Sequence, residues 1–159
     1  MRVLAATLLS MLLVLLVHEG VATAAWAAAD AAGQGQAPET SVRFTSVAVL
    51  IDSGATPLAA WQIELVDPSD RSRIVGIEGG QHPAFIEPAS YDPAALQGGR
   101  IVLAGFSLDE DLPVGETRVA TIHLEVDGPA LVGIECTVEA AGDFAGVEFL
   151  PACRLVYAE

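Results

Sequence analysis

Apolar and polar residues alternate along most of the chain between Val47 and Val126. In the segment TRVATIHLEV, which ends at Val126, every second residue from Ala120 onward is apolar, and the residues between them are polar. The segment AWQIELV, which begins at Ala60, alternates in the same way. Because successive side chains of a β-strand point to opposite faces of a sheet, this period of two predicts half-buried strands.

Glycine, proline and aspartate separate these segments, and no long segment has the period of an amphipathic helix. The arrangement predicts an all-β fold, an immunoglobulin-like or jelly-roll β-sandwich of roughly eight or nine strands. The segment from Gln81 to Gly99 contains His-Pro, Glu-Pro and Asp-Pro pairs, so we expect an ordered loop with at most one short helical turn, at Pro93–Leu96. The predicted strands are Arg43–Ile51, Leu58–Val66, Arg73–Ile77, Arg100–Phe106, Thr117–Val126, Leu131–Glu139 and the shorter Val147–Leu150 and Arg154–Tyr157.

The N-terminus has the layout of a secretory signal peptide. Arg2 supplies a positive charge, Val3–Val17 is a leucine-rich apolar run, and small residues surround Trp26. A charge, then a short apolar core, then small residues is the order that signal peptidase requires. Cleavage is predicted after Ala27, with Ala24 as the alternative last residue removed.

A membrane anchor that stays in the bilayer is the other interpretation of this segment. A span needs about 20 apolar residues to cross roughly 30 Å of hydrocarbon, and His18 and Glu19 interrupt the run sooner. We therefore expect removal of residues 1–27, no stable membrane span afterwards, and a secreted or periplasmic location.

The rest of the chain is expected to form a leader and one domain. Residues 28–40 (AADAAGQGQAPET) have no hydrophobic period and are rich in alanine, glycine and glutamine, which predicts a flexible leader. Residues 41–159 are enough for one β-sandwich and too few for two domains.

The chain is strongly acidic, with a formal net charge of −14 and no lysine. Such a surface repels the phosphates of nucleic acids and the headgroups of anionic lipids. Nucleic-acid binding and peripheral membrane attachment are therefore not expected, and the charge is accounted for by solubility outside the cell.

The two cysteines, Cys136 and Cys153, are predicted to form a disulfide, because an exported chain matures in an oxidising compartment. Cys136 lies on the same strand face as Ile134 and Val138, and Cys153 comes just before the last predicted strand. Closing a loop of this size stabilises a fold by about 3 kcal/mol in the chain-entropy model. No histidine or second cysteine pair lies nearby in sequence to favour a catalytic or metal-binding role.

The order of segments from Val47 to Val126 resembles the cohesin family, whose members are β-sandwich modules of bacterial extracellular proteins related in fold to carbohydrate-binding modules. The matching segments are VAVLIDSG, LAAWQIELVDP, RIVGIEGG, GRIVLAGFS and TRVATIHLEV. The resemblance implies an exported, non-catalytic binding module without a cofactor. Its partner would be a protein, of the dockerin kind, or a carbohydrate. Calcium in cohesin–dockerin complexes belongs to the dockerin, so the resemblance implies no metal site.

The resemblance also points to candidate binding positions. Cohesins that bind dockerins usually carry polar side chains on the outer face of the strand that precedes Asp-Pro. The matching outward positions of this chain are Ala60 and Gln62, which offer less hydrogen bonding. We take them as the candidate binding residues.

A catalytic alternative rests on Asp52. The segment VLIDSGAT, residues 49–56, is similar to the active-site segment of retropepsin-type aspartic proteases. In those enzymes two protomers each supply one carboxylate, and the pair shares a proton. A homodimer with Asp52 in that role is the alternative function. Asp-Ser-Gly is also a common sequence of a tight turn, because aspartate caps the turn and glycine adopts a positive φ. The turn is the interpretation that we favour.

The remaining candidates for site chemistry are few. His82 and His123 stand alone in the sequence and are expected on a loop or on the surface rather than as metal ligands. The run Asp109-Glu110-Asp111 could attract Ca²⁺, although consecutive acids on a loop are more often only solvated. No metal site is therefore predicted.

Overall fold

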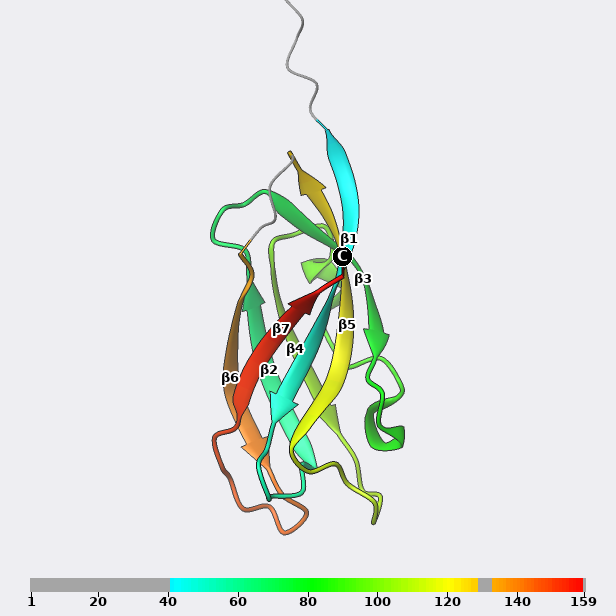
Figure 1. The fold of residues 1–159 in the computed structure, drawn as a ribbon, viewed down its shortest axis with the longest axis vertical. Coiled ribbons are helices and arrows are strands. Elements are labelled where there is room, and N and C mark those ends of the chain that lie inside the picture. Colours follow the sequence, from blue (N-terminus) through cyan, green and yellow to red (C-terminus); the bar gives the residue numbers. More distant parts are fainter. Residues whose placement is uncertain (1–40, 129–132, 159) are drawn as a thin grey trace, which may run out of the picture. The chain divides into compact units, whose positions relative to one another are not determined.

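The structure, a computed structural model, describes residues 41–128 and 133–158. These residues form seven β-strands and two short 3-10 helices (Figure 1). The predicted signal peptide and leader lie outside the described residues, as do the first two residues of the predicted strand Leu131–Glu139. The elements are β1 (Val42–Asp52), β2 (Ala60–Val66), β3 (Ser72–Gly79), η1 (Pro83–Phe85), η2 (Pro93–Ala95), β4 (Arg100–Phe106), β5 (Glu116–Asp127), β6 (Glu135–Gly142) and β7 (Ala152–Tyr157).

The strands make two antiparallel sheets. Sheet A has the order β3-β5-β1-β7, and sheet B has the order β4-β2-β6. In sheet A the two inner strands, β1 and β5, are each paired on both sides, and β2 is the central strand of sheet B. The predicted all-β sandwich is confirmed, and it contains almost no helix.

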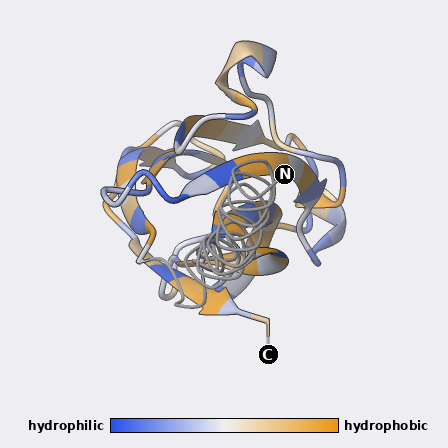
Figure 2. Ribbon diagram, turned by 90° about the horizontal axis from the view of Figure 1, so that it is seen from above, coloured by the Kyte–Doolittle hydropathy of each residue, from blue (hydrophilic) through white to orange (hydrophobic). Residues whose placement is uncertain are grey.

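The core lies between the inner faces of the two sheets. It is made of the apolar residues of the predicted alternation. The apolar positions of β5 from Ala120 to Val126 and those of β2 from Trp61 to Leu65 are buried, and the polar residues between them face outward. In Figure 2 the ribbon changes repeatedly between hydrophobic and hydrophilic colours along the strands. The largest fully buried side chains are Ile51, Leu58, Ile63, Leu65, Ile74, Ile101, Leu103, Ile122, Leu124, Val47, Val49 and Val119.

The predicted strand Val147–Leu150 is wrong, since only a single bridge between Gly142 and Glu148 forms there. The carboxylate of Asp143 accepts hydrogen bonds from the amides of Ala145 and Val147, at 2.9 and 2.8 Å, and folds the segment into a turn. Those hydrogen bonds compete with a strand ladder.

The loop from Gln81 to Gly99 contains two helical turns rather than one. The predicted turn at Pro93–Leu96 is η2, where Asp92 caps the amide of Ala94 at 2.9 Å. The turn that the sequence did not predict is η1, which His82 caps through Nδ1. Histidine is an uncommon N-cap, so the sequence carries little signal for this turn.

Cys136 and Cys153 are joined in the disulfide that the sequence predicted, with a Cα–Cα distance of 6.1 Å. The bond links β6, an edge strand of sheet B, to β7, an edge strand of sheet A. On the same two strands, the backbone amide before β6 at Ile134 donates to the Tyr157 hydroxyl at 2.9 Å. One side of the sandwich is therefore closed by a covalent bond and a hydrogen bond.

Asp67 fixes the connection between β2 and β3. Its carboxylate is buried and accepts hydrogen bonds from the amides and hydroxyls of Ser69 and Ser72 and from the amide of Arg71. Burial by itself would raise the pKa of this carboxyl, but the hydrogen bonds from Ser69 and Ser72 outweigh burial and lower the pKa of Asp67 to about 2.

Within the described ranges, no helix is both long and apolar enough to cross a lipid bilayer.

Candidate functional site

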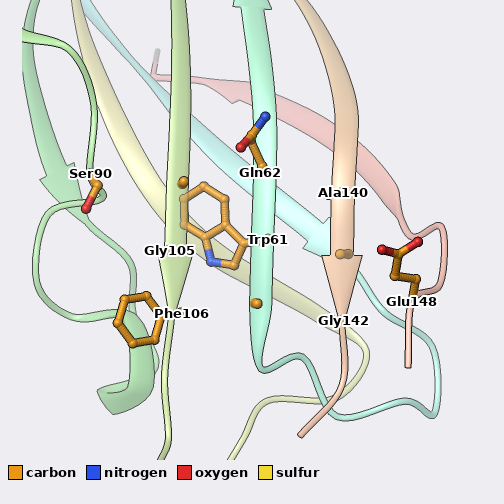
Figure 3. Close-up of a pocket in the computed structure, with 11 residues that line it drawn as sticks. Trp61, Gln62, Ser90, Gly105, Phe106, Ala140, Gly142 and Glu148 are labelled. Atoms are coloured by element: carbon orange, nitrogen blue, oxygen red, sulfur yellow. The ribbon is translucent and has the colours of Figure 1, made fainter. Parts of the chain in front are cut away.

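A cleft of about 390 Å³ lies on the outer face of sheet B, near the ends of β4 and β6 (Figure 3). Its volume is in the range of sites that hold a small ligand or one anchoring side chain. Its lining is mostly small or apolar. The lining residues are Ala60, Trp61, Gln62, Ser90, Ala104, Gly105, Phe106, Ala140, Ala141, Gly142 and Glu148.

Small side chains on three neighbouring strands create the hollow. Gln62 of β2 lies between Ala104 of β4 and Ala140 of β6, and Ala60 lies between Phe106 and Gly142. Because cross-strand neighbours on one face lie about 5 Å apart, small residues at these positions leave the space above them open. The two candidate positions from the sequence, Ala60 and Gln62, are therefore both part of the cleft.

Phe106 and Glu148 border the cleft on opposite sides in Figure 3. The Phe106 side chain, at the end of β4, is 73% exposed. Glu148 comes from the connection between β6 and β7, where its backbone bridges to Gly142. The site thus has an aromatic border on one side and a carboxylate on the other.

Trp61 forms part of the floor from inside the sandwich. Its side chain is only 3% exposed and contacts the Phe85 ring edge to face, with ring centroids 6.0 Å apart. Gly105 lies directly across from Trp61 in the β2–β4 ladder, and a Cβ atom there would be 2.7 Å from the indole. Glycine at position 105 therefore makes room for the tryptophan ring.

A second, smaller cleft of about 220 Å³ lies against the segment of η1. It is lined in part by Pro83 and Glu87 and shares Trp61, Ser90 and Phe106 with the first cleft. Ser90 is held beside β4 by a bridge to Ala104, with both backbone hydrogen bonds formed, at 2.8 and 3.0 Å. The segment before η2 therefore covers part of the open edge of sheet B.

The outer face of sheet A has a different character, because it carries ion pairs between its strands. Arg73 pairs with Glu125 at 3.1 Å and Arg154 with Glu116 at 2.7 Å, and His123 Nε2 lies 3.0 Å from the Glu78 carboxylate. The hydrogen bond and charge of Arg154 lower the pKa of Glu116, and Glu116 in turn raises the pKa of Arg154. Both partners are exposed, so this pair is a surface feature of small energy.

The histidines lie where the sequence predicted. His82 is in the loop before η1, and His123 is on the outer face of β5. In the described part of the chain, no three His, Cys, Asp or Glu side chains gather closely enough to hold a metal ion. In the run Asp109-Glu110-Asp111, the Asp109 carboxylate accepts from the Ser107 hydroxyl at 2.9 Å, which is a local turn.

Asp52 ends β1 and makes the turn that the favoured interpretation predicted. Its carboxylate accepts a hydrogen bond from the Gly54 amide at 3.0 Å, and Gly54 has a positive φ of 60°. This is an Asx turn, in which the side chain replaces a backbone acceptor. Asp52 does not line either cleft.

Sequence reasoning missed Phe106 and Glu148. The two residues lie far apart in the chain, and only the strand order β4-β2-β6 places them on opposite sides of Ala60. The sequence did carry one signal for Phe106. In the alternating segment GRIVLAGF this phenylalanine occupies an outward position, where a large apolar side chain is exposed.

No family model and no curated protein matches the chain. Among solved structures, the chain is similar to the OlpA cohesin–dockerin complex from Clostridium thermocellum, described as a type I complex. The similarity has a TM-score of 0.54 and 17% sequence identity, and it covers 69% of this chain and 82% of that chain. The OlpC cohesin–dockerin complex from the same organism gives a TM-score of 0.53 and 14% identity, and covers 73% and 85%. The chain therefore has the cohesin-like β-sandwich fold that its sequence predicted.

Proposed function

We propose that the chain is an exported, non-catalytic binding module that holds a dockerin-like protein partner on the outer face of sheet B. The observation that carries this proposal is the cleft over Ala60 and Gln62, whose lining is mostly small and apolar. The outer face of sheet A carries ion pairs, which are costly to strip of water, whereas the Arg100–Glu64 ion pair of sheet B lies at the other end of its face from the cleft. The similar solved structures are cohesin–dockerin complexes, which makes a protein partner the natural candidate.

A protein partner suits this cleft better than a polysaccharide. A sugar ring packs its C–H face on the open face of an aromatic ring. Trp61 offers no such face, because it is buried beneath the cleft and packed against Phe85. Phe106 is the remaining aromatic side chain of the lining. Shallow apolar surfaces with a few polar groups are typical of protein interfaces.

Export is part of the proposal, and two features favour it. The first is the charge, apolar core and small residues of positions 1–27. The second is the disulfide between Cys136 and Cys153, because such bonds persist in oxidising compartments and are rare in the cytosol. The location that follows is secreted or periplasmic.

The experiment is affinity capture from the extracellular extract of the source cells, with matched variants on the two faces. Ala60→Glu places a long charged side chain at the cleft, on the central strand of sheet B. Ala48→Glu makes the same change on the outer face of β1, in sheet A. We expect the first variant to lose the captured protein and the second to keep it. Loss in both variants, or in Ala48→Glu alone, would place the binding surface elsewhere.

A further inference from the structure

We propose that the cleft on sheet B accepts one lysine or arginine side chain of the protein partner, with its charged end at Glu148. This inference rests on the proposed function, because it names the anchor of the partner that the module holds. It is carried by the shape of the cleft, the chemistry of its two borders and the charges on this face.

The cleft fits a side chain with a long apolar stem. Its floor is made of the methyl groups of Ala60, Ala104 and Ala140, and no side chain rises from Gly142. A lysine or arginine stem is three or four methylene groups long and is commonly buried along apolar surface while its charged end stays in water. A cleft lined by these alanines matches that requirement.

The Glu148 border favours a cation at the end of that stem. The Glu148 carboxylate lies beside Ala140 and Gly142 in Figure 3, on the cleft side of the β6–β7 connection. In the described ranges, Glu148 has neither a side-chain hydrogen bond nor an ion pair. Phe106, on the opposite border, exposes an aromatic ring that the apolar stem of the same side chain can contact.

No basic side chain of the described chain competes for this place. Arg100 is the arginine on the outer face of sheet B, and it is already paired with Glu64 near the other end of that face. The whole chain has no lysine and a net charge of −14, so its long-range field also attracts cations.

Other anchors fit less well. An acidic side chain would meet the like charge of Glu148. A purely aliphatic anchor would fill the cleft but would cover part of the Glu148 carboxylate without pairing it, which costs free energy. A basic side chain both fills the cleft and pairs the carboxylate.

The test is an NMR titration of the isotope-labelled full chain with matched amino-acid probes. N-acetyl-lysine methylamide carries the stem and the charge, and N-acetyl-norleucine methylamide carries the stem alone. N-acetyl-arginine methylamide distinguishes an ammonium from a guanidinium. The reporters are the Trp61 indole N–H and the Ala140 amide, and Trp26→Phe assigns the indole signal because the chain has two tryptophans.

We expect the lysine or arginine probe to shift both reporters with a Kd of a few millimolar, as for a small fragment of this size. The norleucine probe should bind roughly two- to fivefold more weakly, which is the scale of one exposed ion pair. That difference should shrink when salt is raised from about 0.05 M to about 0.5 M.

Four variants locate the effect. Glu148→Gln should remove the preference for the charged probe, whereas Glu135→Gln, on the exposed part of β6, should keep it. Ala140→Leu should fill the cleft and abolish binding of every probe, whereas Thr137→Leu places a leucine side chain on the same strand away from the cleft and should have no effect.

Equal binding of the lysine and norleucine probes, a preference that survives Glu148→Gln, or no shift at Trp61 and Ala140 would each overturn the inference. The proposed function has a separate readout. Partner capture that Ala60→Glu abolishes and Glu148→Gln leaves unchanged would retain the binding face and reject the cationic anchor.

Discussion

Gly105 of β4 lies directly across the ladder from Trp61 of β2, and an added Cβ atom would be 2.7 Å from the indole Cε2. The tryptophan ring occupies the volume that a side chain at position 105 would need. This relationship fixes the floor of the cleft, because the ring can lie beneath Ala60 and Ala104 only while position 105 is glycine.

The first prediction is that Gly105→Ala destabilises the fold. The added methyl group forces the indole out of place, and such overpacking costs about 1–3 kcal/mol. The free energy of unfolding in urea measures the loss. Gly133→Ala is the control, because a Cβ atom at that position has nothing within 4 Å and should change stability little. Equal stability of the Gly105 variant and the wild type would contradict the packing described here.

The second prediction concerns Asp67 and pH. Its pKa is lowered in the folded chain to about 2 from 3.8, so its contribution to stability is present above about pH 4. As pH falls through the folded pKa, protonation removes that contribution, which is about 2 kcal/mol. Asp67→Asn should lower stability at neutral pH and flatten the decline between about pH 4 and pH 2.

Urea unfolding at a series of pH values measures this effect. Asp111→Asn, in an exposed loop, is the matched control and should leave the acid decline intact. An acid decline of unchanged size in Asp67→Asn would show that another group causes it.

The third prediction concerns the disulfide. Cys136 and Cys153 are 17 residues apart, and opening a loop of that length should lower stability by about 3 kcal/mol. The double variant Cys136→Ala and Cys153→Ala should keep a β-type circular dichroism spectrum with a lower melting temperature. Alkylation of unreduced, denatured protein should label neither cysteine. Free thiols in freshly exported protein would contradict both the pairing and the oxidising compartment.

The fourth prediction separates a turn from a catalytic carboxylate. Asp52→Asn keeps a side-chain acceptor for the Gly54 amide, so it should cost little stability and leave partner capture unchanged. No peptidase activity is expected between about pH 3 and pH 8, the range in which a shared-proton carboxylate pair works. Cleavage that pepstatin inhibits and Asp52→Asn abolishes would overturn the binding function.

Much of the fold could be predicted from the sequence because burial follows a period of two. The inward positions of β2 from Trp61 to Leu65 and of β5 from Ala120 to Val126 are apolar, and that pattern identified both strands and their buried faces. The segment Val147–Leu150 has a similar composition but does not form a strand, because the Asp143 carboxylate accepts hydrogen bonds from the amides of Ala145 and Val147 and makes a turn where the strand would begin. Such hydrogen bonds from a side chain to nearby amides compete with strand formation, and the hydropathy pattern reveals little of them.

The candidate site was predictable only in part. Ala60 and Gln62 could be placed on an outward face by alternation alone. Glu148 could not, because its position at the cleft depends on the bridge to Gly142 and on the pairing of β6 with β2. Strand order is set by long-range contacts, which a local pattern does not encode. The role of Gly105 likewise becomes visible only when the ladder places it across from Trp61.

The measurement that tests the central claim most directly is amide hydrogen exchange on the chain with and without its captured partner. A partner on the outer face of sheet B should slow exchange at the ends of β4 and β6 and in the connection that carries Glu148. The outer strands of sheet A, β3 and β7, should exchange as in the free chain. Protection confined to sheet A, with exchange around Phe106 and Glu148 unchanged, would contradict the account.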